Sequence, residues 1–444
     1  MWGEVGSMSS MGDPLHSAER VALDRLGPLL DSAVLTEAVA RSPWHAARAG
    51  RVLACEVTRV HPRGARGLGV EIHVGLVAGE PGRKISPVAR ESLIGELVPE
   101  DVAHHLAACR ARLGKSRRGQ VSRRELEGRL FALPELGLVV RERGLDERLD
   151  ALRLAATPSA GAALVPAADA ESVRASLLAH RLGKRCVVRV RGDGAGGPRS
   201  VVVKGYRTGS GRATVADGLA RRLRDGGLDG RGGVRVPRPL GVVEDMEAAV
   251  MEDLPDDGGA WLARGDESVA HAAGRALAAL HASPVQVEAW HGPDAERTVV
   301  DRFAALLATA RPELALRVGR SLVQARLALA ALAPGEVRLA HRDYHEKQIT
   351  NDAEGAVIYD FDTVCMADPA LDLGNFLAHV TLAALRHPID EAAVAAAFLD
   401  GYGVPDRALA RRVSTYRSVS CLRLACVHGL AVGGDALARG LLER

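Results

Sequence analysis

Residues 339–376 constrain this chain more than any other stretch, because they crowd acidic, amide and imidazole side chains among short apolar runs. Residues 337–340 are apolar except for Arg338, and apolar character resumes at Ile349 after a polar segment. Turn formers are dense over residues 351–355, and residues 356–359 are typical of a strand. The pattern predicts two short strands joined by a tight turn.

Such a hairpin would bring Asp343, Gln348 and Asp360 close together. Carboxylate and amide oxygens are hard ligands that suit Mg²⁺. If Gln348 and Asp360 hold the metal, Asp343 stays free to accept the proton of an alcohol. The alternative is that these acids are helix caps and turn formers on a solvated loop, and their joint spacing argues against it.

This spacing resembles the signature of the aminoglycoside phosphotransferase and choline kinase-like family, whose members are relatives of the protein kinases. The signature H-x-D-x-x-x-x-N, an apolar strand ending in Asp, and D-P-A-x-D-L matches His341, Asp343, Gln348, Asp360 and residues 368–373. The resemblance implies transfer of the γ-phosphoryl group of ATP, or of GTP, to the hydroxyl of a small molecule with the help of Mg²⁺.

The resemblance also implies individual roles. Asp343 would be the catalytic residue that orients the hydroxyl, Gln348 and Asp360 would hold Mg²⁺, and His341 and Asp372 would support the catalytic loop. Gln348 stands where the family usually has Asn. Its amide oxygen lies one methylene further out, and maltokinase-like members of the wider family look similar at this position.

Lys204 ends the β-branched run 201–203, where a buried ammonium group needs an anionic partner. In the family, a lysine on this strand pairs with nucleotide phosphates, so the resemblance assigns Lys204 to nucleotide binding. The alternative is a strand-end lysine that reaches solvent. The helix predicted after it offers Asp217 instead of the usual Glu, which leaves the lysine's partner open.

Gly183 marks the tip of the turn at residues 180–185, which resembles the phosphate-covering turn of bacterial phosphotransferases. Gly192, Gly194 and Gly197 formally satisfy G-x-G-x-x-G, but a strand follows them instead of a helix. The dinucleotide-binding interpretation therefore fails, and a hairpin is predicted.

Glu252 and Leu254 follow the strand-like residues 248–251 in an acidic segment that ends in a proline. In the family such a segment is the hinge between lobes, so the resemblance implies that backbone groups of Glu252 and Leu254 pair with adenine. A plain strand-to-loop transition is the alternative.

The rest of the chain predicts two β-rich regions and a helical one. Strands are expected at 52–60, 70–77 and 84–88, a helical stretch at 92–126, a strand at 131–140, a helix at 145–154 and a linker at 155–170. A second meander is expected at 173–206, and helices dominate after residue 259.

We therefore predict an α+β, two-lobed protein-kinase-like fold with an N-terminal α/β extension. The extension covers residues 1–165, the β-rich small lobe 166–255 and the α-helical large lobe 256–444. The similar texture of the two meanders raises the hypothesis that the extension contains a diverged copy of a kinase small lobe.

Composition excludes several classes of function. The net charge is only +3, from 58 basic and 55 acidic residues, and aromatic residues make up 3 %, so no nucleic-acid partner is expected. The six cysteines form no metal-binding pair and are predicted to be reduced, as in a cytoplasmic protein. No secretory or membrane-spanning segment is apparent.

The acceptor is left open by the sequence. Acids and arginines are balanced over residues 390–423, which argues against a polycation and leaves a neutral sugar, nucleoside or natural product. Two alternatives stand beside a phosphotransferase of the aminoglycoside type. One is a maltokinase-like sugar kinase, and the other is a catalytically inert kinase-fold protein that binds a nucleotide or a partner.

Overall fold

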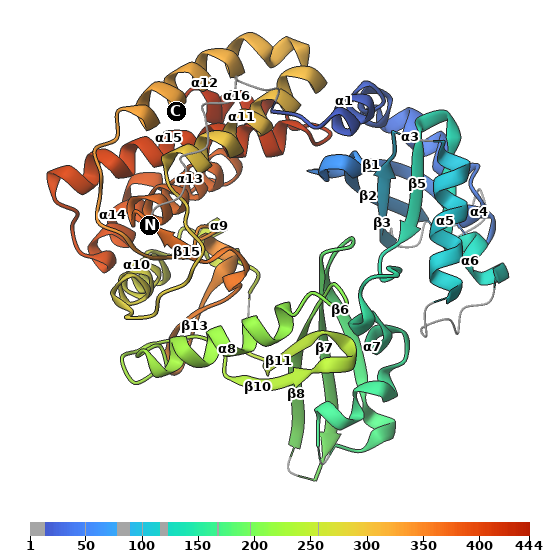
Figure 1. Ribbon diagram of the computed structural model, residues 1–444, viewed down its shortest axis with the longest axis horizontal. Coiled ribbons are helices and arrows are strands. Elements are labelled where there is room, and N and C mark those ends of the chain that lie inside the picture. Colours follow the sequence, from blue (N-terminus) through green and yellow to red (C-terminus); the bar gives the residue numbers. More distant parts are fainter. Residues whose placement is uncertain are drawn as a thin grey trace, which may run out of the picture.

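The computed structural model describes residues 14–48, 50–77, 89–99, 101–115, 123–166, 168–195, 197–255 and 257–444. Three regions follow one another along the chain, and Figure 1 shows them arranged in a ring. The N-terminal unit (blue to cyan) is followed by a small lobe built on a second sheet (green) and by a large helical lobe (yellow to red). The fold is α+β, as the sequence predicts.

The N-terminal unit is built on a five-stranded antiparallel sheet with the order β1-β2-β3-β5-β4. Along β2, Val70, Ile72 and Val74 are buried at every second position, which is the period of a strand with one face in the core. The strands are β1 (Arg51–Pro62), β2 (Leu68–Val77), β3 (Ala89–Leu97), β4 (Leu130–Leu133) and β5 (Leu138–Glu142); the helices are α1 (Ser17–Asp24), α2 (Leu26–Leu29), α3 (Ser32–Ala40), α4 (Pro43–Ala46), α5 (Val102–Lys115) and α6 (Arg123–Arg129).

The helical stretch predicted for residues 92–126 is wrong for its first residues. Residues 92–97 belong to β3, which pairs with β2 on one side and β5 on the other, and the helix begins only at Val102. Pairing on both edges outweighs local preference, as is usual for a central strand. The expected strand at 84–88 lies outside the described residues.

Two further predictions in this region are wrong in detail. Residues 131–140 are not one strand, because Pro134 and Gly137, whose φ is +64°, turn the chain between β4 and β5. Residues 145–154 contain only a 3₁₀ turn at Asp150–Leu152 and the start of the short helix α7 (Arg153–Ala156). The expected linker includes a 3₁₀ helix, Pro158–Leu164, which packs on the second sheet.

The small lobe carries a second five-stranded antiparallel sheet, with the order β10-β11-β8-β7-β6. Helix α8 (Arg212–Asp225) crosses from β8 to the remaining strands. The strands are β6 (Arg174–Arg181), β7 (Arg185–Gly194), β8 (Gly197–Tyr206), β10 (Pro239–Val243) and β11 (Ala248–Glu252). The Gly-rich segment between β7 and β8 is a hairpin, as predicted.

The two sheets have the same topology. In each, a three-stranded meander is followed by a helical crossover and a hairpin whose second strand pairs with the third strand of the meander. Both hairpins turn through a 3₁₀ segment and one left-handed residue, Gly137 or Glu247. This likeness supports the hypothesis of a duplicated small lobe, which stays a proposal.

The large lobe is helical, and two small sheets carry the segment that contains His341, Asp343 and Asp360. Strands β13 and β14 form a hairpin, β14 also pairs with β9, and β12 pairs with β15. The helices are α9 (Ala260–Ala263), α10 (Glu267–Ala282), α11 (Pro293–Ala310), α12 (Ala315–Ala330), α13 (Ala370–Arg386), α14 (Glu391–Tyr402), α15 (Arg407–Gly429) and α16 (Asp435–Leu442); the strands are β9 (Val234–Arg235), β12 (Arg338–Ala340), β13 (Ile349–Asp352), β14 (Gly355–Ile358) and β15 (Cys365–Ala367).

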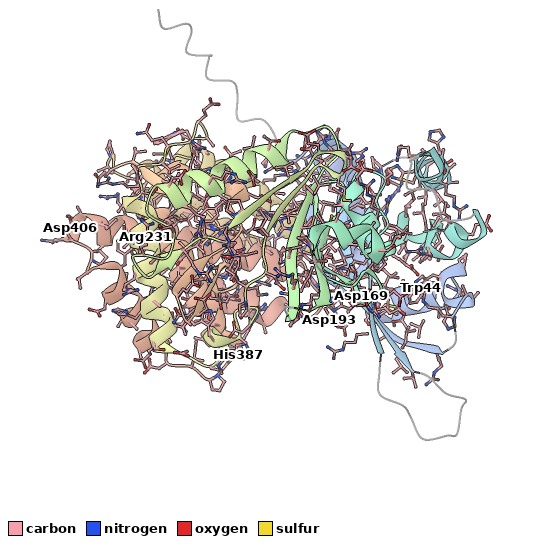
Figure 2. The ribbon with its side chains drawn as sticks, turned by 90° about the horizontal axis from the view of Figure 1, so that it is seen from below. Trp44, Asp169, Asp193, Arg231, His387 and Asp406 are labelled. Carbon is pink, nitrogen blue, oxygen red and sulfur yellow. The ribbon has the colours of Figure 1, made fainter. Side chains whose placement is uncertain are left out.

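The N-terminal unit contacts both lobes. Glu19 in α1 pairs with Arg302 in α11, and Val432 N–H donates to Val57 O over 3.0 Å. Figure 2 shows Trp44 of the N-terminal unit and Asp406 of the large lobe at opposite ends, with the small-lobe sheet between them. Among the described residues, no helix is both long and apolar enough to cross a bilayer.

Candidate active site

The catalytic loop follows β12 and is held by a buried carboxylate. Asp372, in the first turn of α13, accepts hydrogen bonds of 2.6 Å from the backbone N–H groups of both His341 and Arg342. Its Oδ2 also lies 3.1 Å from Nε2 of His281. Arg342 has a φ of +68°, a left-handed conformation that costs energy and needs such bonds to persist. His341 and Asp372 therefore lie where the sequence predicts support for the loop.

Three acids meet between the small and the large lobe. Asp343, Asp360 and Asp362 line a cavity of about 590 Å³, which we call the Asp343 cavity. Its other walls come from the 180–185 turn, from β8 and from the start of α8; they are Arg181, Lys184, Arg185, Tyr206, Arg212 and Thr363. The arrangement sets carboxylates on one side and cations on the other.

Lys204 and Arg185 neutralise two of these acids. Lys204 Nζ lies 2.8 Å from Asp360 Oδ1 and 2.8 Å from Asp362 Oδ1, and Arg185 donates to both oxygens of Asp360 over 2.7 and 2.8 Å. Burial alone would raise the pKa of Asp360, but the charges of Lys204 and Arg185 outweigh burial and hold that pKa well below its usual range. The carboxylate is therefore ionised and able to bind a cation.

A second, apolar cavity adjoins the first and shares Tyr206, Asp360 and Asp362 with it, and Lys204 lies in its wall. Side chains of β7, β8, β11 and α8 form most of its wall, including Val187, Val202 and Met251. Val187 and Val202 lie on the same face of the sheet as Lys204, because Val187 is directly opposite Lys204 and side chains alternate along β8. An apolar cavity beside a charged one suits a ligand with a flat ring and phosphates.

Three other residues predicted for this site do not line either cavity. Gln348 turns its amide toward His345, with 3.3 Å between Nε2 atoms, and Glu252 pairs its carboxylate with Arg235. The backbone N–H of Glu252 already donates to Arg238 O over 3.0 Å, whereas the N–H of Leu254 has no partner among the described residues. Their assigned roles stay predictions.

Gly183 also lies away from the cavity walls, at the tip of the β6–β7 turn with a φ of +66°. Its N–H donates over 2.5 Å to Asp146 Oδ2, and the same oxygen lies 3.2 Å from Nε2 of His180. Asp146 belongs to the N-terminal unit. The turn predicted to cover phosphates is thus fastened from outside the small lobe.

Asp217 in α8 lines the apolar cavity but does not pair with Lys204. It binds Arg221 one turn further along the helix, with 2.7 Å between Oδ2 and Nε. Lys204 instead finds its acids in Asp360 and Asp362 of the large lobe. The usual helix acid is therefore replaced by contacts across the lobes.

The sequence prediction misses Arg185, Tyr206 and Asp362 as residues of the site. Tyr206 Oη donates to Asp362 over 3.0 Å, and Arg185 bridges Asp360 and Asp362. Arg185 follows the turn at Gly183 and Asp362 is two residues after Asp360, so proximity in sequence was the available signal. Which acid each cation meets depends on residues more than 150 positions apart.

Two other clusters hold potential metal ligands. His345, Glu346 and His379 gather their ligand atoms within 4.8 Å, as do Glu96, His105 and Cys109. In the second cluster Arg141 donates to Glu96 over 2.5 Å and to the Cys109 sulfur over 3.4 Å, so a cation is already present. The carboxylates of the Asp343 cavity fit a hard divalent metal better.

Comparison with known proteins agrees with this geometry. The profile of the phosphotransferase enzyme family (APH) matches residues 178–413, more than half of the chain. None of the curated proteins compared with this sequence matches it significantly.

Three solved structures illustrate the resemblance. A choline/ethanolamine kinase family protein from Mesorhizobium loti is 20 % identical, with 61 % of this chain and 83 % of that chain covered and a TM-score of 0.45. An ethanolamine kinase from Plasmodium vivax is 11 % identical, with 62 % of this chain and 82 % of that chain covered and a TM-score of 0.43. A spectinomycin phosphotransferase crystallised with ADP and spectinomycin is 15 % identical, with 56 % of this chain and 81 % of that chain covered and a TM-score of 0.42. Because these TM-scores are below 0.5, the assignment rests on the sequence profile: the chain belongs to the phosphotransferase enzyme family.

Proposed function

We propose that this protein transfers the γ-phosphoryl group of ATP to a hydroxyl of a small molecule. The observation that carries the proposal is the position of Asp343, which shares one cavity with Asp360, the acid that pairs with Lys204. A nucleotide ring in the apolar cavity would direct its phosphates toward Lys204, because the two cavities share that part of their walls. The γ-phosphoryl group would then face Asp343.

The residues of the chain have separable tasks. Lys204 and Arg185 would bind phosphate oxygens, exchanging Asp360 and Asp362 for the nucleotide. Asp343 would orient the acceptor hydroxyl and take its proton. The backbone groups of Glu252 and Leu254 would pair with the base, and Gly183 would lie over the phosphates.

The donor set fits Mg²⁺, because Asp360 and Asp362 present ionised oxygens on a shared wall. Asp360 and Gln348 would hold the ion, Gln348 after its amide turns from His345, and Asp362 is a further ligand. When bound, the metal would neutralise charge on the phosphates.

Each of the two alternative functions is supported by one specific observation. Gln348 in place of Asn favours a maltokinase-like sugar kinase. The contact of Gln348 with His345, and the closed pairing of Lys204 with Asp360, favour an inert protein that binds nucleotide or a partner without turnover.

Thermal unfolding with ATP, with Mg²⁺ and with both tests the proposal on the wild type, on Asp360→Ala and on Asp294→Asn, a control whose side chain is 95 % exposed. A ligand at one hundred times its Kd stabilises the folded state by about 2.7 kcal/mol. We expect MgATP to raise the wild-type and control midpoints and Asp360→Ala to lose the metal-dependent part. If neither MgATP nor MgGTP moves the wild type, the kinase proposal is wrong.

The six cysteines are all buried and unpaired, which supports the proposed cytoplasmic setting. The partners proposed are a nucleotide and a small hydroxyl compound, without nucleic acid or membrane.

A further inference from the structure

Cations from two regions gather at the tip of the β6–β7 turn. Arg181 and Lys184 belong to the turn itself, and three arginines reach it from the N-terminal unit. A Cβ built on Gly183 would lie 3.5 Å from Arg66 Nη1, 3.6 Å from Arg63 Nη2 and 3.6 Å from Arg148 Cδ. The turn is therefore enclosed by positive charge on its outer side as well.

Four of these five cations have no carboxylate partner within the described part of the chain. Only Arg63 is paired, with Glu96. The acids nearby are engaged elsewhere: Asp146 with His180 and Gly183, Glu71 with His61, and Glu96 with Arg63 and Arg141. The unpaired members are Arg66, Arg148, Arg181 and Lys184.

Burial and the charges of neighbouring cations lower the pKa values of three of these side chains. Burial and the neighbouring Arg148 and Arg63 lower the pKa of Arg66, and burial with Arg185 and Arg59 lowers that of Arg181. The pKa of Lys184 is lowered by burial and by Arg181. Arg66, Arg181 and Lys184 are exposed, so solvent screens their repulsion only in part, and a bound anion would offset the rest.

The cluster lies at the entrance to the catalytic loop. Arg181 and Lys184 line the Asp343 cavity and also a small second cavity between the turn and the N-terminal sheet, where His61, Arg63 and Glu71 form part of the wall. We call this second space the interface cavity. A ligand that spans the two cavities would have one end at Asp343 and the other among the cations.

We propose that the acceptor is a hydroxyl compound that also carries an anionic group, a phosphate, sulfate or carboxylate, bound by Arg181 and Lys184 together with Arg66 and Arg148 of the N-terminal unit. Guanidinium groups bind such oxyanions through paired hydrogen bonds. The inference rests on the proposed function and names its substrate class. It also gives the N-terminal unit a task, as one wall of the acceptor site.

The phosphates of the nucleotide could also bind to these cations. The experiment must therefore distinguish the nucleotide phosphates from the anionic group of the acceptor. Lys204 lines the apolar cavity and Arg185 the Asp343 cavity, whereas Arg66 and Arg148 line none of the three cavities and approach the turn from its outer side. Filling the nucleotide site with MgADP therefore leaves the N-terminal cations available to a second anion.

The first measurement is calorimetric titration of the full chain, saturated with MgADP at constant ionic strength, with inorganic phosphate and sulfate. We expect a binding site that MgADP does not remove. The double variant Arg66→Ala/Arg148→Ala should raise the Kd of the anion about tenfold and leave the Kd of MgATP unchanged. Since neither side chain makes an ion pair with a described residue, the variant should fold. The control is Arg51→Ala, at an exposed arginine in β1 of the same N-terminal unit.

The second measurement compares glucose, glucuronate, glucose 6-phosphate and glucosamine as acceptors, by ADP release and by stabilisation of the MgADP complex. We expect the anionic members to act at concentrations at least tenfold lower than the neutral and cationic ones. The inference is overturned if neither phosphate nor sulfate binds the MgADP complex, if the double variant weakens MgATP as much as the anion, or if glucosamine is preferred. Failure of the kinase proposal would look different, because MgATP itself would then not bind the wild type.

Discussion

The two five-stranded sheets share one topology and differ at one decisive position. Counting from the matching hairpin turns, Lys204 of β8 pairs with Ala249 and Glu96 of β3 pairs with Val139, at the same register in each sheet. Lys204 lines the apolar cavity. Glu96 is 5 % exposed and is held inside its own unit.

The residues around these two positions show why only one sheet is suited to nucleotide. In the N-terminal sheet Arg141 binds Glu96 over 2.5 Å and Glu147 over 2.9 Å, Arg63 pairs with Glu96, and His105 lies 3.8 Å away. The corresponding neighbour of Lys204 is Met251, which leaves an apolar wall. A carboxylate at the lysine position would repel phosphate, so under the proposed function the small-lobe sheet would bind the nucleotide and the N-terminal sheet would serve as a scaffold.

The largest effect should come from Asp343→Asn, which leaves both sheets intact and removes only the proposed proton acceptor. We expect phosphoryl transfer to fall by about 10²–10⁴-fold, the usual contribution of general-base catalysis. Calorimetry should find the Kd of MgATP unchanged. Retention of the wild-type rate would remove Asp343 from the mechanism.

Arg141→Met should sharpen the contrast by breaking the scaffold alone. It leaves Glu96 and Glu147 buried with less compensation, and breaking a buried ion pair costs about 3–5 kcal/mol of unfolding free energy. Urea unfolding measures this loss, and Met251→Leu in the other sheet serves as the volume-matched comparison. A loss below about 1 kcal/mol would show that the network contributes little.

Removing the charge at each of the two matching positions, Lys204 and Glu96, tests the comparison directly. Lys204→Met should raise the Kd of MgATP about tenfold or more, because an ion pair to phosphate in a partly buried site is worth over 1.4 kcal/mol. Glu96→Gln should leave that Kd as it is and lower stability only. The contrast between the two sheets would be contradicted if Glu96→Gln raised the Kd of MgATP as much as Lys204→Met does.

His105 gives the N-terminal sheet a pH dependence of its own. Its contacts with Cys109 and Glu96 raise its pKa from 6.5 to about 9. Because the pKa is higher in the folded state, this stabilisation is complete below about pH 6.5 and is lost as the pH rises through 9. Urea midpoints measured from pH 6 to pH 9.5 should fall more steeply for the wild type than for His105→Gln, and parallel curves would contradict the assignment.

The smallest effect is expected from Asp217→Ala. Asp217 pairs with the exposed Arg221 in its own helix, and such exposed pairs contribute little to stability. The Kd of MgATP should stay within twofold of the wild type. A large increase would mean that Lys204 exchanges Asp360 for Asp217 when the nucleotide binds.

The sequence predicts the large lobe and the catalytic segment well, because helices with regular apolar spacing and short strands bounded by turn formers are specified locally. Helices are expected to dominate after residue 259, and α13 and α15 are among those that the structure contains there. Prediction fails at residues 92–97, where a charged segment becomes a central strand. Its pairing partners lie in β2 and β5, and no local pattern reveals them.

By itself, the sequence determined the family and the order of the chemical groups, because the spacing of His341, Asp343, Asp360 and Asp372 is a local property of the chain. The tertiary structure alone decided which charges meet. Arg185 and Lys204 reach Asp360 across the lobes, Asp146 fastens Gly183, and the N-terminal arginines surround the same turn. These contacts join segments far apart in sequence, and electrostatic interactions depend on distance and burial, which only the folded chain sets.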